Sequence, residues 1–149
     1  MKKLFGILLL SCGFLIANGQ DKVKDQDVPQ AVKTAFQSNF TDASDVQWKI
    51  YDGKYKAKFD VNGEKHFAEF TNSGELVAKG MKIDKDQLPS AVSDALRTGY
   101  ANKNIDEVYK VEKGGETLYK VKLEGVNEKM LVYSEDGKLV KEKMKEKTK

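Results

Sequence analysis

The sequence predicts an α+β protein of two tandem units, each a helix followed by a four-stranded antiparallel meander. Three observations support this: an internal repeat offset by 60 to 64 residues, a change from helical to alternating apolar spacing within each unit, and turn dipeptides between the alternating runs. A module of about 60 residues would be marginally stable alone, because small domains bury a small fraction of their surface. We therefore expect one continuous sheet with both helices on one face.

The internal repeat extends along nearly the whole chain. DQDVPQAVKTAFQSNF recurs as DKDQLPSAVSDALRTGY, YKAKFD recurs as YKVKLE, and HFAEFTNSGELVAKGMK recurs as KMLVYSEDGKLVKEKMK. Self-similarity at a nearly constant offset is typical of repeated structural units. The predicted organisation is a signal peptide at 1–19, a first unit at 20–84, a second unit at 85–145 and a polar tail at 146–149.

Each unit begins with a predicted helix. Val28, Val32 and Phe36 recur every four residues, so they share one face of a helix, and the second copy repeats this spacing. Proline is tolerated at a helix start, where its missing N–H has no partner to lose, and a nearby aspartate can cap free N–H groups. The residues expected in these roles are Pro29, Pro89, Asp27 and Asp86.

After each helix the apolar residues alternate with polar ones. The stretches around Trp48 and from Tyr55 to Val61 alternate in this way, which predicts half-buried strands. Asn62-Gly63 lies between two such runs and predicts a tight hairpin, because both residues tolerate positive φ. Residues 76–83 are predicted to form the fourth strand of the first unit.

One helix per unit can cover only one face of a sheet. The side chains predicted to lie under the helices are Trp48, Tyr55, Ala57 and Phe59, and in the second unit Tyr109, Tyr119, Val121 and Leu123. The side chains predicted on the open face are Lys49, Lys56, Lys58, Lys110, Lys120 and Lys122, together with Phe67, Met130 and Val132.

An open face that mixes lysine with apolar groups could serve as a recognition surface. The alternative is an ordinary solvated face on which lysine stems cover scattered apolar atoms. The candidate interaction face comprises Lys56, Lys58, Phe67, Lys120, Lys122, Met130 and Val132.

The N-terminal segment indicates export. Two lysines precede an apolar run at 4–16, and Ala17-Asn18-Gly19 follows, which is the pattern of a cleaved secretory signal peptide. We expect a periplasmic or secreted protein. Cys12 offers a minority alternative, acylation as a lipoprotein, but the apolar run continues beyond it. If Cys12 leaves with the signal peptide, the mature chain has no cysteine for disulfide, nucleophilic or metal chemistry.

The charge pattern argues against nucleic-acid binding. The formal net charge is +3, and two of the basic residues belong to the predicted signal peptide. Arg97 is the only arginine, whereas the arginine fork is the usual means of bidentate phosphate or guanine recognition. We expect no nucleic-acid partner, and the sequence contains no transmembrane segment of about 20 apolar residues.

The sequence offers no catalytic, metal or cofactor motif. His66 is the only histidine, and no Gly-x-Ser-x-Gly motif is present. A zinc site needs at least three protein ligands, and no glycine-rich loop precedes a helix in a way that would hold a phosphate. His66 aligns with Lys129 of the second copy, so we expect a partly exposed strand residue. We predict a protein that is not an enzyme and has no cofactor.

The doubled pattern of VPQAV, YKAKFD and TNSGELV with LPSAV, YKVKLE and SEDGKLV resembles the PepSY-like, β-lactamase-inhibitor-like family of exported bacterial proteins. The resemblance covers nearly the whole mature chain, and its motifs are structural. It implies distant similarity to the β-lactamase inhibitor protein, whose units form one concave sheet, and to the PepSY modules of peptidase propeptides. It does not imply that this chain inhibits either enzyme, and no functional residue is transferred.

Three functions remain open at this stage. The first is a non-enzymatic exported module that binds a protein or peptide, such as a peptidase or another envelope enzyme, through the open face. The second is a periplasmic carrier or sensor of a small ligand, held between helix and sheet or between the two units. The third is a purely structural envelope protein. The sequence does not decide the oligomeric state.

Overall fold

The computed structural model describes residues 21–125 and 128–145, and everything stated about structure concerns these residues. The predicted signal peptide, Cys12 and the tail at 146–149 lie outside them. The first half contains β1 (Asp21–Val23), η1 (Asp25–Asp27), α1 (Gln30–Asn39), β2 (Ser44–Tyr51), β3 (Lys54–Val61), β4 (Glu64–Phe70) and β5 (Leu76–Ile83). The second half contains η2 (Lys85–Gln87), α2 (Ser90–Gly99), β6 (Ile105–Lys113), β7 (Glu116–Leu123), β8 (Glu128–Ser134) and β9 (Leu139–Lys145).

The described strands form one antiparallel sheet of nine strands, arranged in the order in which they occur along the chain. The α+β class and the single continuous sheet are therefore confirmed. The short edge strand β1 was not predicted, and it pairs with β2. An order of 3₁₀ turn, helix and four strands occurs twice along the chain.

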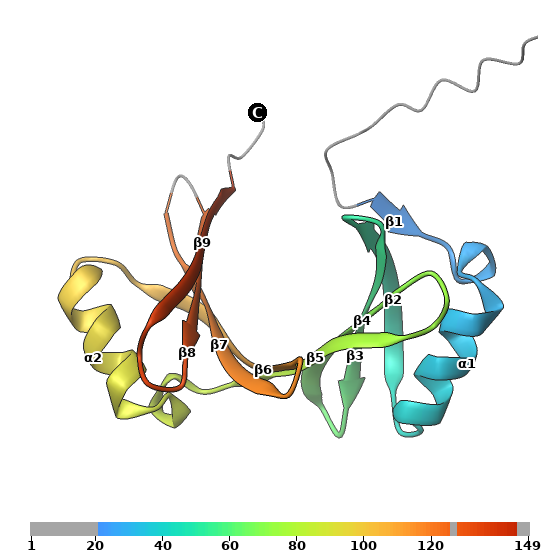
Figure 1. Ribbon diagram of the computed structural model, residues 1–149, viewed down its shortest axis with the longest axis horizontal. Coiled ribbons are helices and arrows are strands. Elements are labelled where there is room, and N and C mark those ends of the chain that lie inside the picture. The colour runs from blue at the N-terminus through green and yellow to red at the C-terminus, as the bar shows by residue number, and fades with distance from the viewer. Residues whose placement is uncertain (1–20, 126–127, 146–149) are drawn as a thin grey trace, which may run out of the picture.

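The sheet is strongly curved, and the two helices lie on its convex side, one near each end (Figure 1). Each helix covers a separate core. Under α1 the buried side chains are Val28, Val32, Phe36, Trp48, Ala57, Phe59, Ala68 and Phe70. Under α2 they are Leu88, Val92, Leu96, Val108, Tyr119, Val121, Leu123, Leu131 and Tyr133. Nothing among the described elements covers the concave side (Figure 1).

The aromatic contacts of Phe36 fix α1 on the sheet. Its ring centroid lies 5.3 Å from that of Trp48 and 5.0 Å from that of Phe59, both in edge-to-face geometry. Such pairs stabilise a fold by about 0.5–1.5 kcal/mol beyond the area that they bury. The apolar residues that recur every four positions in α1 therefore pack against the alternating apolar residues of β2 and β3.

The two prolines lie at the helix starts as predicted, but the predicted capping by aspartate is wrong. Pro29 and Pro89 are the N-cap residues of α1 and α2, and no side chain caps either helix through them. Asp27 and Asp86 lie instead in the preceding 3₁₀ turns. Proline has no hydroxyl or carboxylate to accept the first free N–H groups, so these helices depend on their apolar faces for stability.

The prediction for β6 is wrong by one residue. Tyr109 pairs with Lys82 and Lys120 and points to the concave side, whereas Lys110 pairs with Tyr119 and shares the helix side. Val108 takes the buried position that was predicted for Tyr109. A shift of one residue exchanges the two faces of a strand. Because apolar residues lie on both faces of β6, alternation alone could not choose between the two registers.

Two turn glycines hold the sheet against the helices. Gly74, between β4 and β5, and Gly137, between β8 and β9, have φ of +88° and +84°. A Cβ on Gly74 would lie 2.6 Å from the carbonyl oxygen of Ala31, and one on Gly137 would lie 2.5 Å from that of Ala91. Both turns therefore touch the backbone of a helix at a distance that only glycine permits.

This close approach can be tested with a matched pair of variants. We expect Gly137→Ala to lower the free energy of unfolding by about 2 kcal/mol or more, because it combines backbone strain with a clash against α2. Gly63→Ala is the control, since Gly63 has φ of +82° but no atom within 4 Å of the added Cβ. Urea unfolding measures both. Equal losses in the free energy of unfolding would show that the close contact between the Gly137 turn and α2 does not contribute to stability.

Candidate functional site

The concave face is the face of the sheet opposite to the helices. Lys58 pairs with Phe67, Lys120 with Val132 and Lys122 with Met130. Residues directly opposite each other in an antiparallel pair project to the same side, and this side also carries Lys56. All seven residues of the candidate interaction face therefore share the concave face. Their role in binding stays a prediction.

Two other sheet lysines were also predicted to be on the open face. Lys49 pairs with Lys56 and lies on the concave face. Lys110 lies on the convex face and is the exception.

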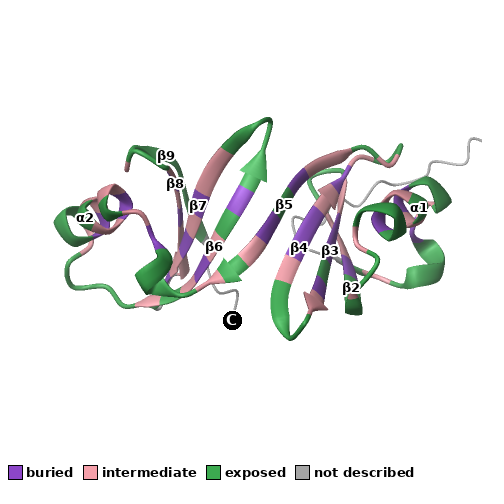
Figure 2. Ribbon diagram, turned by 90° about the horizontal axis from the view of Figure 1, so that it is seen from below, coloured by how far each residue is buried: buried purple, intermediate pink, exposed green. Residues whose placement is uncertain are grey.

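An apolar floor occupies the middle of the concave face. Phe67, Ala78 and Val111 are buried there, with Tyr109 and Leu118 partly buried beside them. These residues come from β4 to β7, where the two halves of the sheet meet, and the buried positions run along the middle of the sheet (Figure 2). The floor is a third apolar cluster, independent of both helices.

A glycine makes room for the ring at the centre of this floor. Gly80 pairs with Phe67 across β4 and β5, and a Cβ on Gly80 would overlap the Phe67 ring. The ring also meets Tyr109 edge to face, with centroids 5.7 Å apart. Phe67 lies on the predicted face, whereas Tyr109, Ala78 and Val111 were not predicted there. The glycine opposite an outward phenylalanine is the signal that could have indicated a buried ring.

Two lysines lie over the Phe67 ring. The Lys56 Nζ is 4.3 Å from the ring centroid and the Lys120 Nζ is 5.6 Å from it. Lys56 also forms an ion pair with Glu69 at 3.1 Å, and only 8% of its surface is exposed. Both ammonium groups are attracted to the face of the ring by cation–π interactions. The centre of the concave face is therefore positively charged and partly withdrawn from water.

Crowding of positive charge changes the protonation of Lys120. Burial, followed by repulsion from Lys56, lowers the pKa of Lys120 to about 8, and Lys58 adds to the repulsion. Glu69 acts in the opposite direction and does not compensate. At neutral pH the fold thus holds a charged lysine in an environment that disfavours the charge.

The outer part of the concave face is different, because its lysines are paired with acids. Lys122 lies 2.9 Å from Asp106 and 3.6 Å from Glu128. The hydrogen bond between Lys122 and Asp106 raises the pKa of Lys122 and lowers the pKa of Asp106. Lys82 and Glu107 form a similar pair at 3.3 Å. The positive charge of Lys122, one of the predicted site residues, is therefore neutralised locally.

A contact between distant strands spans the concave face. Lys143 on β9 donates a hydrogen bond to the Tyr51 hydroxyl on β2, and its Nζ lies 4.9 Å from the Tyr51 ring centroid. This bond raises the pKa of Lys143. The two strands are near opposite ends of the sheet, so they meet only because the sheet curves. Sequence periodicity contains no information about such a contact.

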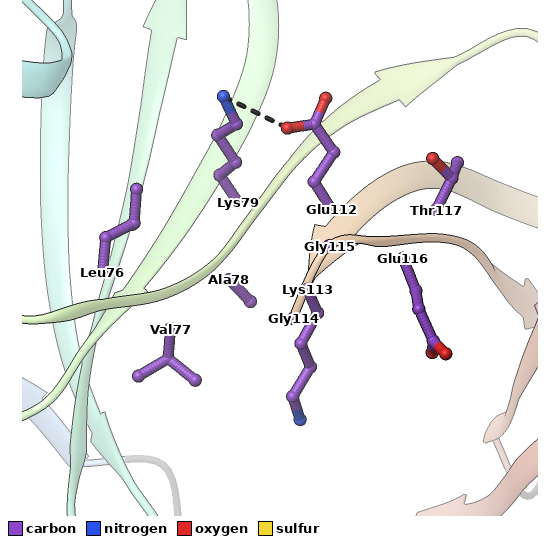
Figure 3. Close-up of a pocket in the computed structure, with 10 residues that line it drawn as sticks. All are labelled: Leu76, Val77, Ala78, Lys79, Glu112, Lys113, Gly114, Gly115, Glu116 and Thr117. Carbon is purple, nitrogen blue, oxygen red and sulfur yellow. Dashed lines mark ion pairs between the residues drawn. The ribbon is translucent and has the colours of Figure 1, made fainter.

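Two hollows in the structure are small and open. One, of about 290 Å³, lies where the start of β5 meets the hairpin between β6 and β7 (Figure 3). An ion pair of 3.2 Å between Lys79 and Glu112 crosses its upper part (Figure 3). The other, of about 280 Å³, lies beside α2. Ligand pockets usually measure about 300–1,000 Å³ and enclose most of the ligand, so neither hollow favours a small-ligand carrier.

His66 and the acidic residues do not assemble a metal centre in the described ranges. No group of three or more histidine, cysteine, aspartate or glutamate residues among residues 21–125 and 128–145 could hold a metal ion. The His66 ring stacks on Phe59, with centroids 5.7 Å apart, and is partly buried on the helix side of β4. Its contact is that of a packed strand residue.

The fold and the open concave face define a small α+β protein whose antiparallel sheet is backed by helices. The family described as "Putative beta-lactamase-inhibitor-like, PepSY-like" matches residues 15–64 and 49–141. The chain belongs to this family. No curated protein is significantly similar to the sequence. In the described part of the chain, no helix is long and apolar enough to cross a membrane.

Crystal structures of related proteins share the fold. A DUF2874 family protein from Bacteroides ovatus is 28% identical, with a TM-score of 0.66 over 78% of this chain and 86% of that one. A BLIP-like protein from Bacteroides fragilis is 25% identical, with a TM-score of 0.63 over 81% and 89%. A protein from Bacteroides eggerthii described as periplasmic is 19% identical, with a TM-score of 0.69 over 78% and 88%, and supports the fold alone.

The lowered pKa of Lys120 predicts a stabilising substitution. Below pH 8 wild type holds a charged Lys120 against its surroundings, and this cost disappears as the pH rises from about 8 to 10.5, because the folded protein loses the proton before the unfolded chain does. We expect Lys120→Met to raise the free energy of unfolding at pH 7 by about 1–3 kcal/mol, at roughly 1.4 kcal/mol per pKa unit. The gain should shrink towards pH 10.5.

Urea unfolding of both proteins between pH 7 and 10.5 measures this difference. Lys110→Met is the matched control, because Lys110 is exposed on the convex face. Its effect should stay within about 0.5 kcal/mol at every pH. If Lys120→Met destabilises the protein at pH 7, the crowded-charge description of the floor is wrong.

Proposed function

We propose that this protein is a non-enzymatic, exported binding module that recognises another protein through the concave face. The observation that supports this most is the pair of lysines over Phe67. Charges withdrawn from water weaken a fold unless partners compensate them, and Lys120 lacks such compensation. Departures from the most stable arrangement concentrate at functional sites. A binding role would account for the buried charge of Lys120, whereas the stability of the fold does not.

The shape and composition of the face also suit a protein partner. Aromatic and apolar side chains form its centre, with charged and polar groups around them, as in the interfaces between proteins. The sheet is concave on this side, so a convex segment of a partner would match its shape (Figure 1). The family description names β-lactamase inhibitors, which act by binding an enzyme, and this supports a protein partner of the same kind.

Export follows from the predicted signal peptide at 1–19, which would place the binding function in the periplasm or outside the cell. We expect the partner to be an envelope or secreted protein, such as a peptidase. The lysines over Phe67 supply charge, and the partly buried Tyr109 and Leu118 supply apolar contact area. Binding needs both, and neither requires a reaction.

Charge reversal on opposite faces of the sheet tests the proposal. Pull-down from an envelope extract with wild type should capture a partner that the double variant Lys58→Glu/Lys120→Glu loses, because two ammonium groups of the concave face become carboxylates. Lys110→Glu/Lys79→Glu makes the same charge change on the convex face and should retain that partner. Circular dichroism checks that each variant is folded. If both double variants capture the same partner equally well, the concave face is not the binding surface.

A further inference from the structure

We propose that the outer edge of β9 is a docking site for an extended segment of a partner protein, which adds a further antiparallel strand to the sheet and places an acidic side chain opposite Lys141. This edge lies apart from the centre of the concave face, and the inference does not rest on the binding function proposed above. It follows from a comparison of the two repeats, the exposure of β9 and the charges along it.

β9 repeats the structure of β5. Leu76 in β5 and Leu139 in β9 each begin their strand beside a register shift against the preceding strand. Met81 and Met144 hold corresponding positions farther along. The two strands differ at their outer edges, because β6 pairs with β5, whereas β8 is the only strand that pairs with β9 in the described part of the chain. β9 therefore has the geometry that receives another strand in the first half of the molecule.

The opposite end of the sheet is covered. β1 pairs with residues 48–50 of β2 in the same way as the end of β5 pairs with residues 108–110 of β6. β1 thus occupies, with three residues, the place that the last strand of a preceding repeat would take. An uncovered edge offers unpaired N–H and C=O groups to other chains, and a short edge strand is one way to prevent this. No described segment covers the outer edge of β9.

The apolar side chains of β9 are exposed. Among the described residues, five large apolar side chains are exposed, and three of them lie on this strand. They are 41–60% exposed: Leu139, Val140 and Met144. The corresponding residues of β5, at positions 76, 77 and 81, are partly buried. A strand added at the β9 edge would remove apolar surface from water, which favours binding.

Lysine side chains oppose pairing with a second copy of the chain. Lys141 and Lys143 pair with Val132 and Met130 and project to the concave side. Two copies that pair antiparallel, with their concave faces on one side, bring odd-numbered residues opposite odd-numbered ones. Registers centred on residue 141, 142 or 143 therefore all set lysine against lysine, which is destabilising. The charge favours a strand of different sequence.

An acidic residue is the favourable partner for Lys141. Lys141 is exposed, and an opposite charge directly across a strand pair stabilises that pair. Glu142, the acidic residue of β9, already forms an ion pair with Lys129 on the neighbouring strand β8. By sequence β9 contains three lysines and this one glutamate. An incoming strand that carries acidic side chains on its concave side therefore complements the edge.

The strand geometry also specifies an apolar position in the partner. Met144 lies three residues after Lys141, on the opposite face of β9. In an antiparallel partner strand, the residue opposite Met144 precedes the residue opposite Lys141 by three positions. An apolar side chain there would cover Met144. The matching segment is extended and carries an apolar residue followed, three positions later, by aspartate or glutamate. Main-chain hydrogen bonds supply affinity in this mode, and alternate side chains supply specificity.

A peptide modified along one edge of its backbone tests strand addition. The probe is the peptide TTVEKEVTT with acetyl and amide ends, and calorimetry measures its binding to the full chain. One isomer is N-methylated at both glutamates, and the other at the valines and the lysine. Because alternate N–H groups of a strand point to opposite edges, we expect one isomer to lose about tenfold or more in affinity and the other to stay within about threefold. Bound peptide should also protect alternate β9 amides from hydrogen exchange.

Charge reversal tests the acidic position. Lys141→Glu should weaken binding of this peptide by about threefold or more, and a peptide with lysine in place of both glutamates should prefer this variant to wild type. Lys110→Glu makes the same change on the convex face and should stay within about twofold.

Four results would each overturn the inference. They are equal affinity for the two methylated isomers, unchanged binding to Lys141→Glu, absence of binding up to about 1 mM peptide, and protection of amides elsewhere than on β9. Self-association of the free chain that protects the β9 amides would assign the edge to a second copy and would also overturn it. Sedimentation of the free chain measures this self-association.

Discussion

The packing of Phe67 on Gly80 is the contact on which the concave face depends. It places an aromatic ring flat against the sheet where the two halves meet, between β4 and β6, and brings that ring to Tyr109. The ring belongs to an apolar cluster in the middle of the sheet that lies apart from the two helix-covered cores. The ring then serves as the surface over which Lys56 and Lys120 lie. One side chain thus links the continuity of the sheet to the charge at its centre.

The charges on the concave face are arranged differently at the rim and at the centre. At the rim, lysines such as Lys122 lie among acids, an arrangement that keeps the surface solvated and contributes at most about 1 kcal/mol per pair. At the centre, Lys120 remains charged although burial and like charges oppose it. A chain optimised only for stability would have an apolar residue at position 120. Met130 and Val132, on the neighbouring strand β8, are apolar residues of the same face.

Much of the fold could be predicted because repeat, periodicity and turn chemistry agree. Leu76–Ile83 is a strand as expected, and the sheet is continuous. The register of β6 could not be predicted, since Val108 and Tyr109 are both apolar and both faces of this strand are packed. The edge strand β1 has only three residues, too few for a period to show.

The shared face of the seven candidate residues could be predicted from alternation, whereas the charge crowding could not. Lys56 and Lys120 are 64 positions apart in sequence, and only the curvature brings their ammonium groups over one ring. The contact between Tyr51 and Lys143 depends on the same curvature. Pairwise strand registers specify neighbours, but the bend accumulated over nine strands decides what meets across the concave side.

The central claim is that Lys120 is a partly buried ammonium group whose charge is disfavoured by burial and by neighbouring lysines. Its pKa can be measured directly by following the lysine side-chain carbon resonances in an NMR titration, with the signal assigned by its absence in Lys120→Met. The structure predicts a midpoint near pH 8. A midpoint near 10.5, the ordinary value for lysine, would contradict this claim.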